Sequence, residues 1–275
     1  MGSETVLEIR GLARTFRRGG DTEIRALRDV TLNLERGEFV VVLGTNGSGK
    51  STLLNEIAGG LPPESGTIMI AGEDVTRWPE HRRARLVARA FQNPFTGTAP
   101  NLTVAENLAL AAQRGGGNRL APALGRERME VISQRVAELG MELEDRLDTP
   151  MGQLSGGQRQ ALTLLMATLV RPELLLLDEH TAALDPRMAE KVMRLTQRMI
   201  DRERLTTLMV THALPQAIRY GDRVIMMHRG RIAVEFSGAA KRMLRVQDLL
   251  DRFDQLRAAD LLDESAEAML RRLYV

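Results

Sequence analysis

The sequence contains no cysteine, which excludes a disulfide framework and thiolate chemistry. Lysine is nearly absent as well, since Lys50, Lys191 and Lys241 are its only occurrences. Charge of one sign is not in excess either, because 38 basic and 36 acidic side chains leave a formal net charge of +2. This balance indicates no strong attraction to nucleic acid or to a charged membrane surface, so we expect no nucleic-acid partner.

Hydrophobic runs of membrane-spanning length are also missing. The first residues include Glu4, Glu8 and Arg10 and hold no apolar stretch, so no secretory signal is visible. No window approaches the ~18 uninterrupted apolar residues that indicate a membrane helix. The longest apolar runs, such as 174–177, have the length of a buried strand. We therefore expect a cytoplasmic protein.

Short aliphatic and β-branched runs recur along the chain, with helical stretches between several of them. The expected strands are 6–9, 31–34, 39–43, 67–70, 86–91, 174–177, 206–210, 224–227 and 232–236. Helix signals are strongest over 50–59 and 185–202. This alternation, with continuous apolar strands, predicts an α/β fold with a mostly parallel sheet covered on both faces. Turn signals at 36–37 and 71–72 predict that the early strands form an antiparallel β flank.

Strand signals vanish from about residue 94 to 169, where helical periodicity takes over. We interpret this block as an α-helical lobe inserted into an α/β domain that spans residues 1–238. Within it, 114–125 is rich in Gly, Pro and Ala and is expected to be a mobile loop. A basic stretch at 81–85 is interpreted as a solvated helix face, because no aromatic residues interleave with it.

Residues 239–275 are predicted to form a C-terminal helical extension. Apolar side chains recur there at helical spacing, namely Val246, Leu249, Leu250, Phe253 and Leu256. The role of this extension stays open at this point, with regulation, a dimer contact and a simple lid as the alternatives.

A phosphate-binding loop is predicted where a strong strand meets a helix. Its residues are Gly44, Thr45, Asn46, Gly47, Ser48, Gly49, Lys50 and Ser51. Glycines let backbone N–H groups converge on phosphate oxygens without a Cβ in the way, and the helix N-terminus adds partial positive charge. Lys50 is expected to reach the β- and γ-phosphates, and the Ser51 hydroxyl to bind Mg²⁺. A glycine-rich turn that merely precedes a helix is the alternative interpretation.

Two carboxylates follow the expected strand at 174–177. Asp178 and Glu179 would therefore lie at the carboxyl edge of the sheet, where open α/β sheets bind their ligands. We expect Asp178 to hold Mg²⁺ directly or indirectly, and Glu179 to orient and activate the attacking water. An apolar strand followed by Asp-Glu is by itself a common surface turn. Together with the phosphate loop, it favours the catalytic interpretation.

The string Leu154-Ser155-Gly156-Gly157-Gln158 precedes an apolar helical stretch at 161–169. A serine hydroxyl and two glycine amides at a helix start form a second candidate anion site. Two candidate phosphate-binding sites in one chain suggest that two chains share each nucleotide.

Together these residues resemble the nucleotide-binding subunit of ATP-binding cassette (ABC) transporters. The string 154–158 matches the signature of that family letter for letter, and the match is collinear over about residues 5–238. The order along the chain also agrees, with the phosphate loop followed by Gln92, the signature, Asp-Glu and His212. The resemblance implies a P-loop NTPase core and an ATPase that binds ATP and Mg²⁺.

The resemblance also implies roles for single residues. Gln92 corresponds to the glutamine that joins the core to the lobe and senses Mg²⁺, and Asp185 to the loop that crosses the dimer interface. His212 corresponds to the switch histidine on the γ-phosphate, the alternative being a surface histidine. Phe16 stands where the family has an aromatic that stacks on adenine, the alternative being a core side chain.

The expected site can then be given in full. Catalytic roles are expected for Glu179, His212, Gln92 and Lys50. Nucleotide contacts are expected from Phe16, Gly44, Thr45, Asn46, Gly47, Ser48, Gly49, Lys50, Ser51, Thr52, Ser155, Gly156, Gly157, Gln158 and Asp185. Metal contacts are expected from Ser51, Gln92 and Asp178.

Three features depart from the family pattern. His180 follows Glu179 where the family usually has proline, and Arg159 is followed by Gln160 and Ala161 without the second basic residue common there. Residues 239–275 extend past the part that matches. None of these departures touches the expected catalytic residues.

With no membrane segment of its own, the chain is expected to drive transport through a separate transmembrane permease subunit. The other expected partners are a second copy of the chain, in a head-to-tail dimer around ATP, and a solute-binding protein. The chain would then lie on the cytoplasmic face of the cell membrane. We expect an importer ATPase; an exporter ATPase and a soluble ABC ATPase of the iron–sulfur assembly type are the alternatives. A DNA-repair motor would need a long coiled coil at the lobe, and the helical block is too short for one. A translation factor would need two cassettes in one chain, and this sequence shows one.

Overall fold

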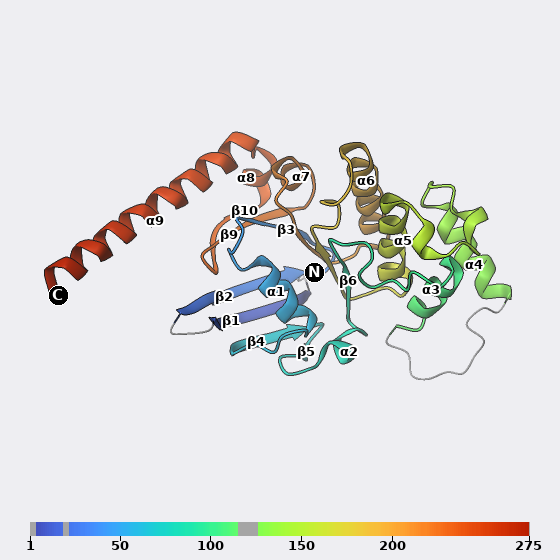
Figure 1. The fold of residues 1–275 in the computed structure, drawn as a ribbon, viewed down its shortest axis with the longest axis horizontal. Coiled ribbons are helices and arrows are strands. Elements are labelled where there is room, and N and C mark those ends of the chain that lie inside the picture. Colours follow the sequence, from blue (N-terminus) through green and yellow to red (C-terminus); the bar gives the residue numbers. More distant parts are fainter. Residues whose placement is uncertain (1–3, 19–21, 115–125, 275) are drawn as a thin grey trace.

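A computed structural model describes residues 4–18, 22–114 and 126–274 and contains two sheets (Figure 1). The smaller sheet is antiparallel, in the order β2-β1-β4-β5. Its strands are β1 (Thr5–Arg18), β2 (Thr22–Glu35), β4 (Ser65–Ile70) and β5 (Glu73–Asp74). The early strands therefore form the antiparallel flank that the turn signals predict.

The larger sheet has the order β10-β9-β3-β8-β7-β6. All its neighbouring strands pair in parallel except β9 and β10. Its strands are β3 (Phe39–Gly44), β6 (Val87–Ala90), β7 (Leu174–Asp178), β8 (Thr207–Val210), β9 (Arg223–His228) and β10 (Arg231–Phe236). The mostly parallel sheet is thus confirmed. Each expected strand has a counterpart, but β1 continues to Arg18 instead of ending at residue 9, β2 begins at Thr22 instead of residue 31, and β5 was not expected.

Both faces of the larger sheet are covered, because alternate residues of β3 point into two different cores. Val41 and Leu43 belong to a buried cluster that includes side chains of α5 and α6. Val40 and Val42 belong to a second cluster that includes α1 and the antiparallel sheet. All six residues of β3 are buried, which explains why this strand reads as one uninterrupted apolar run.

The helices lie between and after these strands (Figure 1). They are α1 (Lys50–Ala58), α2 (Glu80–Arg83), α3 (Val104–Ala111), α4 (Arg126–Ala137), α5 (Gly156–Leu169), α6 (Pro186–Glu203), α7 (Leu214–Arg219), α8 (Gly238–Arg242) and α9 (Val246–Tyr274). Short 3₁₀ turns cover Glu144–Arg146 and Met151–Gln153. Within the described residues, the chain between β6 and β7 forms helices and turns and one isolated β-bridge, as the inserted lobe requires. The mobile loop predicted for 114–125 lies, apart from Arg114, outside the described residues.

The interpretation of the basic stretch at 81–85 as a solvated face is wrong for Arg83, whereas His81, Arg82 and Arg85 are exposed. Arg83 is 1% exposed, and its guanidinium donates hydrogen bonds to four backbone carbonyls, two of which belong to Glu56 and Ile57 in the last turn of α1. It therefore satisfies carbonyls that the end of a helix leaves without partners. Arg82 and Arg85 instead stack against Trp78, with guanidinium carbons 4.0 and 4.7 Å from the ring centroid.

The C-terminal residues form α8 and α9, and α9 extends away from the sheets (Figure 1). The helix begins against the main core, since Leu244 and Leu249 belong to the same buried cluster as Val224. The division of the chain at residue 238 stays a prediction. No helix in the described part of the chain is long and apolar enough to cross a membrane.

Candidate nucleotide-binding site

The phosphate loop joins the buried end of β3 to the first turn of α1. Gly47 and Gly49 have positive φ angles of 79° and 103°, a region that favours glycine. A Cβ on Gly49 would lie 2.4 Å from the carbonyl oxygen of Ala26, so the loop also needs glycine there for space. The Ser48 hydroxyl is buried without a hydrogen-bond partner in the described structure. Local backbone geometry thus agrees with the sequence prediction.

Lys50 folds back over this loop. Its Nζ donates to the carbonyl oxygens of Gly44 and Thr45, at 2.8 and 2.9 Å. The side chain is only 6% exposed, and this burial lowers the pKa of Lys50, while the nearby carboxylates of Glu179 and Asp178 act in the opposite direction. An ammonium held by carbonyls beside two carboxylates is a cation that phosphate oxygens can recruit.

The carboxylates and the histidine predicted to be catalytic lie together. Glu179 follows β7 with a φ of 46°, and its backbone N–H donates to the carbonyl of Val210 at the end of β8. Its Oε2 lies 3.2 Å from Nδ1 of His212, which follows β8. Parallel pairing of β7 with β8 brings these two loops to the same edge of the sheet.

A hollow of about 970 Å³, the nucleotide hollow, opens at this edge. Its volume is in the range of ligand sites in proteins. The predicted site residues that line it are Gly44, Thr45, Asn46, Ser51, Gln92, Asp178, Glu179 and His212. The structure therefore brings together the phosphate loop, both carboxylates, the glutamine and the histidine.

The signature residues do not line this hollow. Ser155 caps α5: its Oγ accepts the Gln158 N–H at 3.3 Å, and its own N–H donates to the Gln158 side chain at 3.2 Å. Ser155 and Gly156 are exposed, whereas Gly157 is buried against Met188. A second chain is thus needed if the signature is to meet a phosphate bound by the phosphate loop.

Seven other predicted site residues do not line the nucleotide hollow: Gly47, Ser48, Gly49, Lys50 and Thr52, which belong to the phosphate loop and the first turn of α1, and Phe16 and Asp185, which lie elsewhere. Phe16 is on β1 and is 38% exposed, with the Arg14 guanidinium 5.5 Å from its ring centroid. An exposed ring leaves a face on which a base could stack. Asp185 caps α6, because its carboxylate accepts the N–H groups of Arg187 and Met188, each at 3.1 Å. This structural role is one that the sequence prediction did not assign.

Arg89 is a site residue that sequence reasoning missed. It lies on β6, three residues before Gln92, and its guanidinium donates to Asp178 Oδ2 at 2.6 Å and to Asn55 Oδ1 on α1 at 2.7 Å. The ion-paired side chains are 14% and 16% exposed. The signal available in the sequence is a single charged residue within an otherwise apolar strand.

His180, the departure from the family pattern, is fully enclosed. It is 2% exposed, and burial lowers its pKa to about 4. Its Nε2 lies 3.0 Å from the Thr196 hydroxyl, which donates to the Val192 carbonyl at 2.9 Å. Since the hydroxyl hydrogen is committed to that carbonyl, the Nε2 atom carries the hydrogen, and the ring is neutral at pH 7.

The far wall of the nucleotide hollow is made by α9, through Leu250, Phe253, Asp254 and Arg257. The helix is held by Asp260, whose carboxylate oxygens lie 2.7 Å from His228 Nε2 and 3.1 Å from Arg229 Nε. Both partners belong to the end of β9 and the turn before β10. The next residue of that turn, Gly230, donates its N–H to the Ser48 carbonyl. The C-terminal helix is thus part of the surroundings of the site, which sequence periodicity alone did not indicate.

Comparison with known proteins agrees with this geometry. The family model described as ABC transporter matches residues 27–182. A tyrosine transport ATP-binding protein of Clostridioides difficile is 39% identical over 249 residues, which cover 90% of this chain and 99% of that protein. A thiamine import ATP-binding protein of Salmonella choleraesuis is 40% identical over 205 residues, which cover 74% of this chain and 81% of that protein.

A solved structure supports the same assignment. The dimeric ATP-binding cassette MJ0796, in a post-hydrolysis state bound to ADP and Pi, is 30% identical with a TM-score of 0.72. The match covers 84% of this chain and 98% of that one. This chain therefore belongs to the ABC transporter family and carries its ATP-binding, ATP-hydrolysing cassette.

Proposed function

We propose that this chain powers the import of a small solute through a separate transmembrane permease subunit. The observation that carries this proposal is the convergence of the phosphate loop, Gln92, Asp178, Glu179 and His212 on one hollow. Relatives named for tyrosine transport and thiamine import support a small organic solute as the cargo. The chain would act on the cytoplasmic face of the cell membrane, with a solute-binding protein in the same system.

Each residue in the nucleotide hollow has a proposed role. The phosphate-loop N–H groups and Lys50 bind the phosphates, and His212 contacts the γ-phosphate. Glu179 orients the attacking water and accepts its proton, since its carboxylate faces the same hollow and no guanidinium among the described residues is paired with it. His212 lies within 3.2 Å of that carboxylate, so it can hold Glu179 in place until nucleotide separates the two side chains.

A magnesium ion fits the oxygen donors present. The Ser51 hydroxyl, the Gln92 amide and the Asp178 carboxylate line the same hollow and are hard oxygen ligands of the kind that Mg²⁺ prefers. One carboxylate oxygen of Asp178 accepts a hydrogen bond from Arg89, and the other makes no hydrogen bond or ion pair within the described residues. When bound, the ion would neutralise charge on the phosphate oxygens.

A second copy of the chain is the proposed partner across the nucleotide. Ser155 and Gly156 of the signature are exposed at the N-terminus of α5, and the signature lies outside the nucleotide hollow of its own chain. In a head-to-tail dimer it would supply the serine hydroxyl and helix N-terminus to the nucleotide held by the other copy. The dimeric state of the related cassette with ADP and Pi supports this arrangement.

The permease is proposed to dock in a groove between the lobe and the core. This groove, of about 510 Å³, is lined mainly by apolar side chains, among them Phe91, Leu110 and Met166. Leu110 is 55% exposed, which indicates an unfilled contact surface. Phe91 directly precedes Gln92, and its carbonyl accepts a hydrogen bond from Gln160 of α5 at 3.3 Å. Movement at the groove would therefore reach the nucleotide hollow through one short segment.

Replacing Glu179 by glutamine tests the catalytic assignment. The Glu179→Gln variant should bind ATP and form dimers while its ATPase rate falls by at least about 100-fold, because the amide cannot accept the proton. A variant that hydrolyses ATP at the wild-type rate would contradict the assignment. Co-purification tests the partner: a protein with several apolar spans supports transport, whereas a soluble scaffold supports the iron–sulfur assembly alternative.

A further inference from the structure

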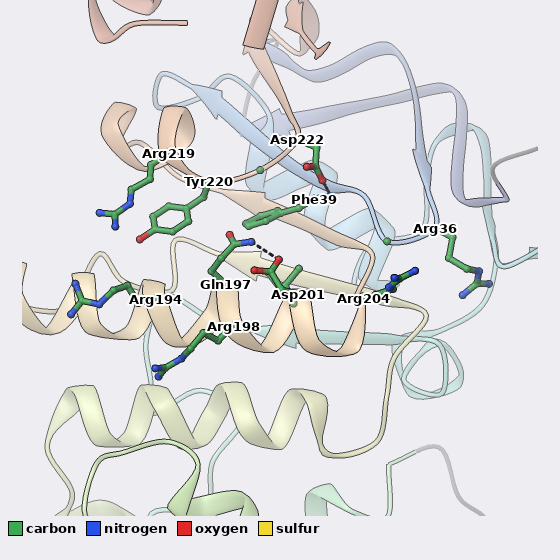
Figure 2. A pocket seen from close by; sticks show the side chains of 13 residues that line it. Arg36, Phe39, Arg194, Gln197, Arg198, Asp201, Arg204, Arg219, Tyr220 and Asp222 are labelled. Atoms are coloured by element: carbon green, nitrogen blue, oxygen red, sulfur yellow. Dashed lines mark hydrogen bonds between the residues drawn. The ribbon is translucent and has the colours of Figure 1, made fainter. Parts of the chain in front are cut away.

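A second hollow lies at the opposite edge of the larger sheet, where its strands begin (Figure 2). It has a volume of about 870 Å³ and lies between the second half of α6, the end of α7 and the start of β3. We name it the arginine hollow, because five guanidinium groups line it: those of Arg36, Arg194, Arg198, Arg204 and Arg219. Only two aspartates, Asp201 and Asp222, line it as well.

The acidic groups do not neutralise the side of the hollow formed by α6 and α7. Arg194 and Arg219 share a single carboxylate oxygen of Glu190, at 3.2 and 2.6 Å. Arg198, one turn along α6 from Arg194, has no hydrogen-bond or ion-pair partner among the described residues. Arg194, Arg198 and Arg219 therefore lie with two carboxylates on this side, those of Glu190 and Asp201, which leaves an excess of one positive charge.

The two lining aspartates are bound to neutral donors. Asp201 accepts a hydrogen bond from the Gln197 side chain at 2.7 Å, a contact drawn in Figure 2. Asp222 accepts the backbone N–H of Phe39 at 2.9 Å. On the far side, Arg36 is matched by Glu4 and Glu173. Both aspartates keep their negative charge, so the excess around Arg194, Arg198 and Arg219 amounts to one positive charge.

A buried hydroxyl without a partner lies at the same place. Tyr220 is 5% exposed, and its Oη atom has no hydrogen-bond partner in the described structure. Figure 2 shows this hydroxyl pointing toward the side where the Arg194 and Arg219 guanidinium groups lie. Burial raises the pKa of Tyr220, so the phenol stays a neutral donor. Leaving such a group unpaired costs about 1–3 kcal/mol, and most buried hydroxyls in native proteins have a partner.

We propose that the arginine hollow binds a phosphate dianion, free or as the terminal group of a small metabolite. Guanidinium groups match phosphate oxygens in geometry as well as in charge, and the enclosed Tyr220 hydroxyl would donate to the phosphate once the side chains that cover it move aside. A nucleoside is disfavoured as the ligand, because the two aromatic side chains that line the hollow, Phe39 and Tyr220, are 2% and 5% exposed and offer no free ring face.

Calorimetric titration of the full chain tests this proposal. The protein is first saturated with Mg²⁺ and a non-hydrolysable ATP analogue, which keeps the probes out of the phosphate loop. Inorganic phosphate and glycerol 3-phosphate are then titrated separately, and whichever binds more tightly identifies the free ion or the phosphomonoester as the better ligand. We expect at least one dissociation constant below about 10 mM. Binding of neither probe in that range would overturn the proposal.

Single substitutions test whether the phosphate probes bind at the arginine hollow. Arg198→Gln should weaken the binding of the better probe about tenfold, since a charge-assisted hydrogen bond is lost. Tyr220→Phe should also weaken it, without lowering the unfolding temperature in phosphate-free buffer, because the hydroxyl has no protein partner to lose. Arg171→Gln is the matched control: this arginine is exposed, lies at the same sheet edge and does not line the hollow. An equal loss in Arg171→Gln, or none in Arg198→Gln, would contradict the site.

Discussion

Replacing Arg89 by methionine should destabilise the folded chain, because Arg89 holds a mostly buried carboxylate. The guanidinium makes two short hydrogen bonds, to Asp178 Oδ2 at 2.6 Å and to Asn55 Oδ1 at 2.7 Å. Methionine keeps much of the apolar stem but removes both bonds and the charge. Asp178 is then left as a mostly buried carboxylate without its counter-ion.

The expected cost follows from how deeply the pair is buried. Removing one partner of a fully buried ion pair costs about 3–5 kcal/mol, and an exposed pair contributes at most about 1 kcal/mol. The Arg89 and Asp178 side chains are 14% and 16% exposed, so we expect a loss of about 2–4 kcal/mol. For a chain of this size, that loss corresponds to a decrease of roughly 4–8 °C in unfolding temperature.

Thermal unfolding followed by circular dichroism measures this decrease. Arg202→Met is the control, because Arg202 also binds two acidic side chains, Glu138 and Glu203, but is 45% exposed. It should shift the unfolding temperature by no more than about 2 °C. Adding MgATP should narrow the gap between Arg89→Met and wild type, since the metal proposed here supplies a cation beside Asp178. An unfolding temperature within about 1 °C of wild type would refute the reasoning.

Three further perturbations have defined outcomes. The buried His180 has a pKa of about 4 when folded, below its usual value near 6.5, so its contribution to stability is complete above about pH 6.5 and is lost as the pH falls toward 4. Urea unfolding across this range should show that acid lowers the free energy of unfolding less for His180→Gln than for wild type. The control His81→Gln should lose as much free energy of unfolding as wild type. Phe16→Ala should raise the KM for ATP about tenfold with little change in kcat, and an unchanged KM would rule out stacking. Gly49→Ala should abolish nucleotide binding measured by fluorescence titration, because its Cβ would clash with the Ala26 carbonyl; unchanged affinity would show that the loop adapts.

The fold and the centre of the site follow from local sequence patterns. Residues 39–43 form a buried strand because each is apolar, and the glycines after it fit the positive φ angles of the loop. Asp178 and Glu179 reach the same hollow because parallel strands end at one edge. These features depend on residues adjacent in the chain, or on a regular topology.

Features that depend on contacts between distant segments could not be predicted. Arg83 reads as part of a charged helix face, yet it is buried against the end of α1, which lies about 25 residues earlier in the chain. The partner of Arg89 is 89 positions away on β7. The amphipathic spacing of α9 predicts a helix, but it does not predict which surface the helix covers. That position depends on the contacts of Asp260 with His228 and Arg229.

The location of α9 has a consequence for assembly of the transporter. Phe253 and Arg257 line the nucleotide hollow, so a second subunit that binds the same nucleotide would have to fit beside this helix. The carboxylate of Asp260 is anchored to a turn that is itself bonded to the phosphate loop, so displacement of the helix and rearrangement of the loop are mechanically connected. We therefore expect α9 to influence how readily two copies close around ATP.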